Sequence, residues 1–280
     1  MRARKRFGQH FLERAWVNKL VAASGFTADD AVLEIGPGRG AITRPLSEKA
    51  GRLLAIEVDR LLAADLEAAA LPNLGVVTGD VLQVDLGRVV GDWLGAAPGP
   101  GNQIRLIGNL PYNLSSPILF ALLDFAARTH GVRDALLMLQ KEVADRLVAR
   151  VGTRDYGVLT VLTGLHADVT RVLSLPPGAF RPAPKVHSAV VRLTFRPSPV
   201  SIADPELFEA MVRTIFTQRR KTTANALKSF AADRGLEAGR VLIGVGIDPQ
   251  RRPETLELAE MAALAGTFAA RPSNASAPVS

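Results

Sequence analysis

The stretch Ala31-Val-Leu-Glu-Ile-Gly-Pro-Gly-Arg-Gly40 joins a short apolar run to a glycine-rich turn. The apolar run followed by glycines predicts a buried strand that ends in a tight turn. A helical pattern over residues 41–50 follows, so the turn lies at a helix N-terminus, which attracts negative charge. The stretch therefore predicts a strand–turn–helix unit, with either a ligand at the turn or a purely structural turn.

Short apolar runs and helical patterns alternate on both sides of this unit. The expected strands are residues 31–36, 52–58, 75–78, 104–109 and 133–140, and the expected helices are residues 41–50, 60–70, 116–128 and 141–150. Such alternation predicts βαβ units and a mostly parallel sheet covered by helices on both faces. Strand candidates at residues 167–173 and 188–195 flank a proline-rich stretch, which predicts an antiparallel edge.

The chain is expected to form two domains. An α/β domain covers residues 1–200, of which residues 1–14 form a basic N-terminal segment. The helical pattern that follows predicts a small all-helical domain over residues 201–270. Residues 271–280 are rich in Pro, Ser and Ala, a composition typical of a disordered tail.

Positive charge is concentrated in two segments. The chain has 34 Lys and Arg residues against 27 Asp and Glu residues, a formal charge of +7. Residues 1–14 contain five basic residues and one acidic residue, and residues 210–235 contain six and one. This distribution indicates a polyanionic partner, although a solvated tail and a solvated helix face explain it equally well.

Several classes of protein are excluded by composition. The chain has no cysteine and four scattered histidines, so we expect no disulfide, no thiol nucleophile and no metal site. No apolar run approaches the length of about 18–20 residues that crosses a bilayer, and the N-terminus lacks the apolar core of a signal peptide. We therefore expect a soluble, cytoplasmic protein.

The glycine turn alone permits two ligands. Gly36, Gly38 and Ala41 satisfy the dinucleotide fingerprint, and Glu57, 21 residues after Gly36, suits a ribose-binding acid in either case. Glu34, two residues before the first glycine, favours S-adenosylmethionine, because an acid suits an ammonium and a sulfonium better than a pyrophosphate.

Asp80 follows the third expected strand. It is a candidate acceptor for the adenine amino group of such a cofactor, or else a loop or cap aspartate.

A second motif, Asn109-Leu-Pro-Tyr112, follows the fourth expected strand at the carboxyl edge of the sheet, where open α/β sheets bind ligands. An adenine amine is a poor nucleophile because its lone pair is delocalised into the ring. The Asn109 amide oxygen and the Leu110 carbonyl suit its two N–H groups, Pro111 fixes the turn, and Tyr112 suits stacking on a base. The motif predicts methyl transfer to an adenine amine.

Together these motifs resemble the bacterial small-subunit ribosomal RNA adenine N6,N6-dimethyltransferases over about residues 4–265. The resemblance rests on Lys5-Arg-Phe-Gly-Gln-His-Phe-Leu12, Glu34-Ile-Gly-Pro-Gly38, Ile56-Glu-Val-Asp59, Asn109-Leu-Pro-Tyr-Asn-Leu-Ser-Ser-Pro117, Leu139-Gln-Lys-Glu-Val143, Pro176-Pro-Gly-Ala-Phe-Arg-Pro-Ala-Pro-Lys-Val186 and Gln218-Arg-Arg-Lys-Thr222. It implies a Rossmann-like class I methyltransferase with a mostly parallel seven-stranded sheet, an antiparallel edge and a helical C-terminal domain.

The resemblance also implies the partners. S-adenosylmethionine is the methyl donor, and the substrate is a pair of neighbouring adenines in the loop of the 3′-terminal hairpin of 16S rRNA, in an assembling small subunit. A monomer is implied, with a possible role in subunit biogenesis.

The resemblance assigns roles to individual residues. With the glycine-turn residues Glu34 and Gly38, the cofactor contacts are His10, Leu12, Gly36, Glu57, Asp80 and Asn109, and residues 1–14 close over the cofactor. Phe180 joins Tyr112 in sandwiching the target adenine, or else is a core residue in a proline-rich turn. Phosphate contacts are expected from Arg4, Lys5, Arg6, Arg219, Arg220 and Lys221.

One position departs from the family pattern. The family often has Asn where this chain has His10, so a side-chain contact to the cofactor is not implied there, whereas a backbone contact survives the change.

Three alternatives remain at this point. The first is a dimethyltransferase of large-subunit rRNA of the macrolide-resistance type, which residues 218–222 and 184–188 disfavour. The second is a non-catalytic ribosome-assembly factor on the same fold. The third is a nicotinamide-dependent oxidoreductase, in which Asn109-Leu-Pro-Tyr112 has no role.

Overall fold

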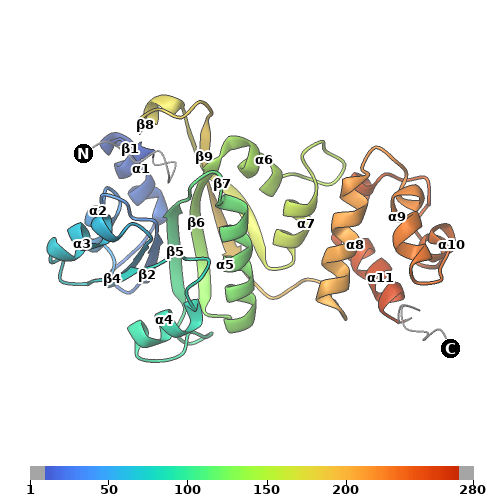
Figure 1. Ribbon diagram of the computed structural model, residues 1–280, viewed down its shortest axis with the longest axis horizontal. Helices are drawn as coiled ribbons and strands as arrows, with labels where there is room; N and C mark the ends of the chain where they lie inside the picture. The colour runs from blue at the N-terminus through green and yellow to red at the C-terminus, as the bar shows by residue number, and fades with distance from the viewer. Residues whose placement is uncertain (1–9, 271–280) are drawn as a thin grey trace. The chain divides into compact units, whose positions relative to one another are not determined.

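The structure is a computed structural model that describes residues 10–270. The described residues divide into two compact units, residues 10–144 with 166–196 and residues 145–165 with 197–270 (Figure 1). The expected basic segment 1–14 is described only from residue 10 onward, and the expected tail 271–280 lies outside the described residues.

The first unit is built on a seven-stranded sheet in the order β4-β3-β2-β5-β6-β9-β7. Its strands are β2 (Ala31–Ile35), β3 (Arg52–Glu57), β4 (Leu74–Thr78), β5 (Ile104–Asn109), β6 (Val132–Gln140), β7 (Ala167–Leu175) and β9 (Ser188–Phe195). β2 to β6 run parallel, as expected from the alternating pattern. A second, two-stranded sheet pairs β1 (Phe11–Leu12) with β8 (Phe180–Arg181).

The antiparallel edge predicted from the sequence is confirmed, with β9 placed between β6 and β7. β9 pairs antiparallel with both β6 and β7, so β7 forms the edge and runs parallel to β6. Residues 176–187, which join β7 to β9, contain only the short helix η2 (Pro177–Ala179) and β8, and no crossover helix. A connection without a crossover makes consecutive strands antiparallel neighbours.

Helices precede, connect and follow the parallel strands. They are α1 (Arg14–Ser24), α2 (Thr43–Ser47), α3 (Arg60–Ala68), α4 (Leu86–Leu94), α5 (Ser115–Thr129) and α6 (Lys141–Leu147). In Figure 1, α2 and α3 lie beside β3 and β4, whereas α5 lies against β6. The strands bury apolar side chains on both faces, and Val32, Leu33, Leu106 and Ile107 have no exposed surface.

The helices differ from the sequence prediction in length and number. α2 and α6 are shorter than the expected helices 41–50 and 141–150, and α1 and α4 were not predicted. α4 is amphipathic, begins at the N-cap Asp85 and ends at Gly95 in the left-handed region, with φ of 78°. An aspartate N-cap and a glycine after the last turn are common signals of helix ends. The sequence prediction missed them because the Gly/Pro-rich loop 95–101 follows directly.

The second unit is helical. It contains α7 (Val158–Gly164), α8 (Pro205–Thr217), α9 (Thr223–Ala232), α10 (Ala238–Gly244), η3 (Pro253–Thr255) and α11 (Leu258–Ala269). Its core includes Phe208 and Met211 of α8, and the rings of Phe230 and Phe268 meet edge to face at 5.2 Å.

Residues 145–165 belong to this helical unit, whereas the sequence assigned them to the domain 1–200. Tyr156 is 4% exposed, and its hydroxyl donates to the carbonyl of Leu256 at 3.1 Å. The amide of Gly152 donates to the carbonyl of Glu254 at 2.7 Å. These contacts join segments about 100 residues apart, which a reading along the chain cannot detect.

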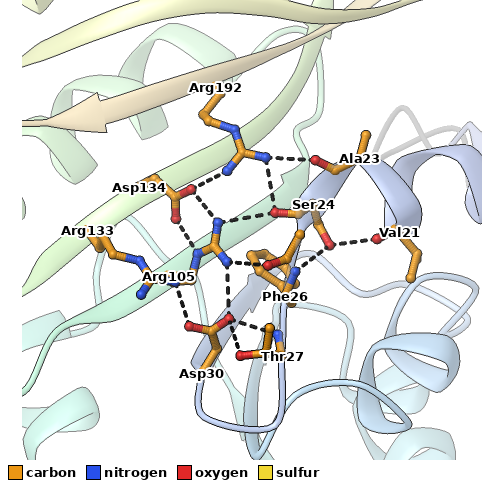
Figure 2. Close-up of polar contacts among 11 residues, drawn as sticks. Val21, Ala23, Ser24, Phe26, Thr27, Asp30, Arg105, Arg133, Asp134 and Arg192 are labelled. Atoms are coloured by element: carbon orange, nitrogen blue, oxygen red, sulfur yellow. Dashed lines mark hydrogen bonds and ion pairs between the residues drawn. The ribbon is translucent and has the colours of Figure 1, made fainter.

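A buried ionic network ties α1 to the sheet, at the amino ends of the strands (Figure 2). The Arg105 guanidinium, on β5, donates to both oxygens of Asp134 on β6 at 2.6 Å and to Asp30 at 3.1 Å. It also donates to the carbonyls of Ser24 and Gly25 at the end of α1. Cations at a helix C-terminus complement its partial negative charge, so the network fixes α1, which directly follows β1.

Candidate active site

The strand register brings the two predicted motifs together. Ile35 of β2 pairs with Ile56 of β3 and with Gly108 of β5. The residues that follow these three, Gly36, Glu57 and Asn109, therefore lie side by side at the carboxyl edge of the sheet. The chain turns outward in opposite directions from β2 and β5, which makes this the switch point where such sheets bind ligands.

The glycine turn requires its glycines. Gly36 and Gly38 have φ of 67° and 58°, in the left-handed region that disfavours other residues. A Cβ on Gly38 would lie 3.3 Å from the Phe11 ring, and a Cβ on Gly36 would lie 4.0 Å from the Asn109 carbonyl. The turn therefore approaches both the N-terminal strand and the second motif closely.

Glu57 holds this turn in place. It is the last residue of β3 and is 4% exposed. Its Oε2 accepts from the Gly38 amide and its Oε1 from the Asp59 amide, each at 2.9 Å. Each carboxylate oxygen has a second lone pair, so Glu57 can still accept a hydrogen bond from a hydroxyl group of a ligand.

Glu34 lies under the turn and does not line the pocket around it. Its side chain is 1% exposed, and its Oε2 has no hydrogen-bond partner among the described residues. Burial raises the pKa of Glu34 to about 8, and the charge of Glu57 acts in the same direction. The nearby Thr43 hydroxyl lowers the pKa but does not offset burial. Its predicted contact with the cofactor remains a prediction.

Asp80 follows β4 and also lies outside the pocket lining. Its Oδ1 accepts from the amide of Leu82 at 3.0 Å, so Asp80 caps its own turn. This oxygen thus has the capping role given above as the alternative. The contact of Asp80 with a cofactor adenine remains a prediction.

The second motif lines the opposite wall of the pocket. Asn109 ends β5, and the Leu110 amide donates to the Met138 carbonyl at 3.2 Å. The Leu110 carbonyl accepts no hydrogen bond within the described part of the chain. The Pro111 carbonyl accepts from Leu114 at 2.9 Å, which closes the turn before α5. The motif thus presents one free backbone acceptor beside the Asn109 amide.

Tyr112 is held by a residue that sequence reasoning missed. Its hydroxyl lies 2.6 Å from the hydroxyl of Ser188, the first residue of β9, which is 1% exposed. Burial raises the pKa of Tyr112, and the Ser188 hydrogen bond lowers it by less. Tyr112 is therefore a neutral aromatic ring with a fixed orientation. Ser188 lies beside the proline-rich motif, which was the available signal.

The N-terminal strand covers the pocket. Phe11 lies under the Arg39 guanidinium, 4.4 Å from its ring centroid. The side-chain amide of Asn109 donates to the His10 carbonyl at 3.0 Å. Leu12 pairs with Phe180 in the small sheet, and the Glu13 amide donates to the Ala179 carbonyl at 2.9 Å. Residues 10–12 are thus joined to the glycine turn, to the second motif and to β8.

Phe180 has no exposed surface and packs in an apolar cluster with Leu12, Met138 and Val190. It does not line the pocket, so in this conformation it occupies the core position given above as the alternative. A stacking role alongside Tyr112 requires Phe180 to become accessible, and that role remains a prediction.

One pocket brings together most of the predicted catalytic and cofactor-binding residues. It is lined by His10, Phe11, Leu12, Gly36, Pro37, Gly38, Ala41, Ile42, Glu57, Val58, Asn109, Leu110, Pro111, Tyr112, Asn113 and Leu114. Sequence reasoning did not single out Val58 or Leu114, which are 46% and 37% exposed. Exposed apolar side chains beside a glycine turn and an acid suit a ligand with both a ring and hydroxyl groups.

Comparison with known proteins identifies the family. The family model described as Ribosomal RNA adenine dimethylase matches residues 1–264. The chain belongs to this family. It is 47% identical over 267 residues to ribosomal RNA small subunit methyltransferase A of Xanthomonas oryzae pv. oryzae, covering 94% of this chain and 95% of that protein. The protein of the same name from Xylella fastidiosa is 45% identical over the same shares of both chains.

Solved structures share the fold of this family member. A dimethyladenosine transferase from Plasmodium falciparum has a TM-score of 0.76 at 24% identity, covering 93% of this chain and 98% of that one. The 23S rRNA methyltransferase ErmE has a TM-score of 0.62 at 26% identity, covering 92% and 99%. The chain is a class I methyltransferase with a mostly parallel seven-stranded sheet.

The pocket fits S-adenosylmethionine, the methyl donor of the family. Gly36 and Gly38 leave room for a ligand against the backbone, and Glu57 offers carboxylate oxygens for ribose hydroxyls. Val58 and Ile42 provide apolar surface for an adenine ring. These residues would hold the cofactor, and Asn109 and Leu110 would hold the amine that accepts its methyl group.

Three of the six predicted phosphate-binding residues lie in the second unit, in the turn between α8 and α9. Arg219 is half-buried, and Arg220 and Lys221 are exposed. None of the three forms an ion pair with another described residue. The remaining three, Arg4, Lys5 and Arg6, lie outside the described residues.

Residues 10–270 contain neither a membrane-spanning helix nor a metal-binding cluster. No helix there is long and apolar enough to cross a membrane. No cluster of His, Asp or Glu side chains in this part of the chain could hold a metal ion.

Proposed function

We propose that the protein dimethylates N6 of two adjacent adenines in the loop of the 3′-terminal hairpin of 16S rRNA, in the small subunit or its precursor. The observation that carries this proposal is the register that places Gly36, Glu57 and Asn109 at one edge of the sheet. The small-subunit substrate is supported by relatives named ribosomal RNA small subunit methyltransferase A. Action on an assembling subunit gives the enzyme a role in subunit biogenesis.

The orientation of Asn109 determines how it meets the target amine. Its Nδ2 donates to the His10 carbonyl, and a carbonyl can only accept, so Oδ1 faces away from the N-terminal strand. Oδ1 then accepts one N6–H of the adenine, and the Leu110 carbonyl accepts the other. Two acceptors out of the ring plane draw the nitrogen toward tetrahedral geometry and localise its lone pair.

Tyr112 and Pro111 position the base. Pro111 fixes the backbone of the turn, and the hydrogen bond to Ser188 orients the Tyr112 ring. Stacking of a base on such a ring contributes about 1–3 kcal/mol and holds the amine in line with the incoming methyl group. Loop adenines are already unpaired, so little energy is spent in exposing them.

S-adenosylmethionine supplies an electrophilic methyl group when it is bound. Phe11 and Leu12 cover the pocket and exclude water from the reacting atoms. The acceptors Asn109 and Leu110 hold the amine, and no strong general base is required because the amine becomes acidic once it gains a methyl group. Positioning and desolvation therefore provide most of the acceleration.

The helical unit supplies the RNA contacts. Arg219, Arg220 and Lys221 bind phosphates and fix the register of the RNA without reading sequence. Arg4, Lys5 and Arg6 are expected to add to the footprint from the N-terminal segment. The enzyme is proposed to act as a monomer in the cytoplasm, where ribosomal subunits assemble.

Methylation assays with separated substrates test the reaction. The protein is incubated with labelled S-adenosylmethionine and with undermethylated small subunits, large subunits or naked rRNA, and N6,N6-dimethyladenine is mapped. Label at the two loop adenines of small subunits supports the proposal. Label only in large subunits favours the macrolide-resistance activity, and RNA binding without label favours an assembly factor.

Salt titration tests the phosphate contacts. Replacing Arg219, Arg220 and Lys221 together with Ala should flatten the dependence of log K on log salt by about 0.7 per lost contact. The control replaces Lys49, Arg88 and Arg128, three exposed cations of the first unit, and removes the same charge. Equal slopes for the two triple variants would contradict the assignment.

A further inference from the structure

The ring of His10 lies where the target base is expected. Its imidazole stacks on the Tyr112 ring, with centroids 5.6 Å apart and planes 24° from parallel. Tyr112 is the residue on which the proposed reaction stacks an adenine. The face of Tyr112 that His10 covers is therefore not open to a base in this conformation.

The imidazole of His10 also contacts a backbone carbonyl, although not the Leu110 carbonyl proposed to hold the adenine amine. Its Nδ1 lies 2.8 Å from the carbonyl of Pro182, in the loop after β8. Because a carbonyl can only accept, Nδ1 carries the proton and donates. His10 is thus a flat nitrogen heterocycle that stacks on Tyr112 and donates an N–H to a backbone carbonyl, as an adenine does.

The residues next to the His10 imidazole are also held in place over the pocket. β1 pairs Leu12 with Phe180, and Phe180 has no exposed surface. Phe11 is held under Arg39. Asn109 is bonded to the backbone carbonyl of His10, not to its side chain, so this anchor persists when the imidazole moves or is removed. The imidazole can therefore leave Tyr112 without disturbing the orientation of Asn109.

We propose that the His10 side chain is a built-in occupant of the acceptor-base site, and that the target adenine must displace it from Tyr112. The inference rests on the proposed function, in which Tyr112 receives the base. Adenine has a larger ring system than imidazole, so it gains more from the Tyr112 face and displaces the histidine. His10 excludes water and ill-fitting bases from the site between turnovers, and it sets the affinity threshold that a base must exceed.

The test measures base stacking directly. The probe is a hairpin oligoribonucleotide with two adjacent loop adenines, one replaced by 2-aminopurine, whose fluorescence falls when it stacks on an aromatic ring. The full-length protein is used with saturating S-adenosylhomocysteine. His10→Ala removes the competing ring, and should raise the equilibrium constant for stacking about two- to tenfold, the range expected for one aromatic pair. His10→Phe restores a competing ring and should return stacking to the level of the unaltered protein or below.

Controls separate this role from the alternatives. His187→Ala removes an exposed histidine outside the pocket lining and should change nothing. Affinity for S-adenosylhomocysteine should be the same in His10→Ala and in the unaltered protein. With small subunits, His10→Ala should lower KM for the RNA, because the base no longer has to displace a ring from Tyr112.

Each other outcome overturns the proposal. Weaker or unchanged stacking in His10→Ala would make His10 a supporting platform or a bystander. Weaker cofactor binding with unchanged stacking would make it a cofactor contact only. If Tyr112→Ala leaves the quenching of the unaltered protein intact, the base does not lie on Tyr112, and the proposed function itself fails at this step.

Discussion

The carboxylate of Glu57 accepts a hydrogen bond from the backbone amide of Gly38 at 2.9 Å, so the end of β3 fixes the glycine turn that follows β2. The second oxygen of Glu57 accepts from Asp59, at the start of α3. A single buried acid therefore both shapes the turn and presents oxygens to the pocket. Deletion of the side chain would remove both its observed hydrogen bonds in the fold and its proposed contact with ribose.

Glu57→Gln tests this double role. A Gln amide can accept at one end only, so one of the two backbone donors is left facing an NH2 group, at a cost of about 1–3 kcal/mol. We expect weaker S-adenosylhomocysteine binding by calorimetry and a lower free energy of unfolding in urea. Glu67→Gln, on the exposed face of α3, is the matched control and should change neither. Unchanged cofactor affinity in Glu57→Gln would remove Glu57 from the cofactor site.

Asn109 should contribute to the chemical step more than to binding. Asn109→Ala removes the side-chain acceptor for the amine, and loss of one positioned group of this kind lowers kcat by about 10²–10³-fold. Cofactor affinity should fall less than kcat, because the glycine turn and Glu57 remain. Single-turnover rates on undermethylated small subunits measure this effect. Full activity in Asn109→Ala would overturn the proposed mechanism.

The sequence predicted the pocket lining better than it predicted the residues that support it. The glycine motif pointed to Gly36, the spacing of 21 residues to Glu57, and the position of Asn109-Leu-Pro-Tyr112 after a strand to Asn109. The strand register brings the three together. Ser188 and Arg39 were not found, because their partners Tyr112 and Phe11 are distant in the chain. Contacts of this kind depend on how strands and loops meet, which periodicity does not specify.

The order of the sheet and the division of the chain show the same limit. The pattern of residues 167–173 and 188–195 predicted two strands, but not that β9 inserts between β6 and β7. Residues 145–165 carry no composition shift, yet Tyr156 and Gly152 bond to residues near 255. Contacts between residues distant in the chain determine the strand order and the division into units, whereas local patterns determine where the helices and strands form.

Tyr112 and Ser188 should act as a pair. Tyr112→Phe keeps the stacking ring but leaves the buried Ser188 hydroxyl without this partner, so we expect near-normal kcat and a stability loss of about 1–3 kcal/mol. Adding Ser188→Ala should recover part of that loss, since both polar groups are then gone. Tyr112→Ala removes the ring and should lower kcat/KM about 5- to 150-fold. Urea titrations of the unaltered protein, Tyr112→Phe, Ser188→Ala and the double variant would give additive losses if the two residues do not act together. Initial rates of Tyr112→Ala measure the stacking contribution.

The Arg105 network should dominate the stability of the first unit. Arg105→Met leaves Asp134 and Asp30 buried without their main cation, and loss of one partner in such a network costs about 3–5 kcal/mol. The control is Arg128→Ala, which breaks an exposed pair with Asp124 and should cost at most about 1 kcal/mol. Urea denaturation followed by circular dichroism distinguishes the two, and equal losses would contradict the importance of burial.

The same network predicts the response to acid. Burial acts to raise the pKa of Asp30, but the Thr27 amide, Arg105 and Arg133 outweigh it, so the folded pKa lies below the ordinary value of 3.8. A carboxyl group with a depressed folded pKa stabilises the fold above its unfolded pKa. That stability is lost as the pH falls through the folded pKa. Stability should therefore decline below about pH 4 in the unaltered protein, and this acid dependence should be weaker in Asp30→Asn.

Glu34 gives a pH dependence of the opposite sign. Its folded pKa is about 8 and its ordinary value is 4.5, because burial disfavours the charged form. Between these values the folded state retains a proton that the unfolded state has lost, so stability falls as the pH rises from about 4.5 to 8 and is level above that. Glu34→Gln keeps the shape of the protonated acid and removes the titration.

We therefore expect Glu34→Gln to match the unaltered protein near pH 5 and to be more stable than it at pH 8.5, when unfolding is measured in urea at both values. The variant also tests the predicted cofactor role. If Glu34 attracts the positive charge of the cofactor, Glu34→Gln should bind S-adenosylmethionine more weakly at pH 8.5 although its fold is more stable. If Glu34 is only a buried support under the glycine turn, cofactor affinity should follow stability and not charge. If the difference in stability between Glu34→Gln and the unaltered protein is the same at both pH values, the pKa of Glu34 is not raised in the folded protein. Both expectations then lose their basis.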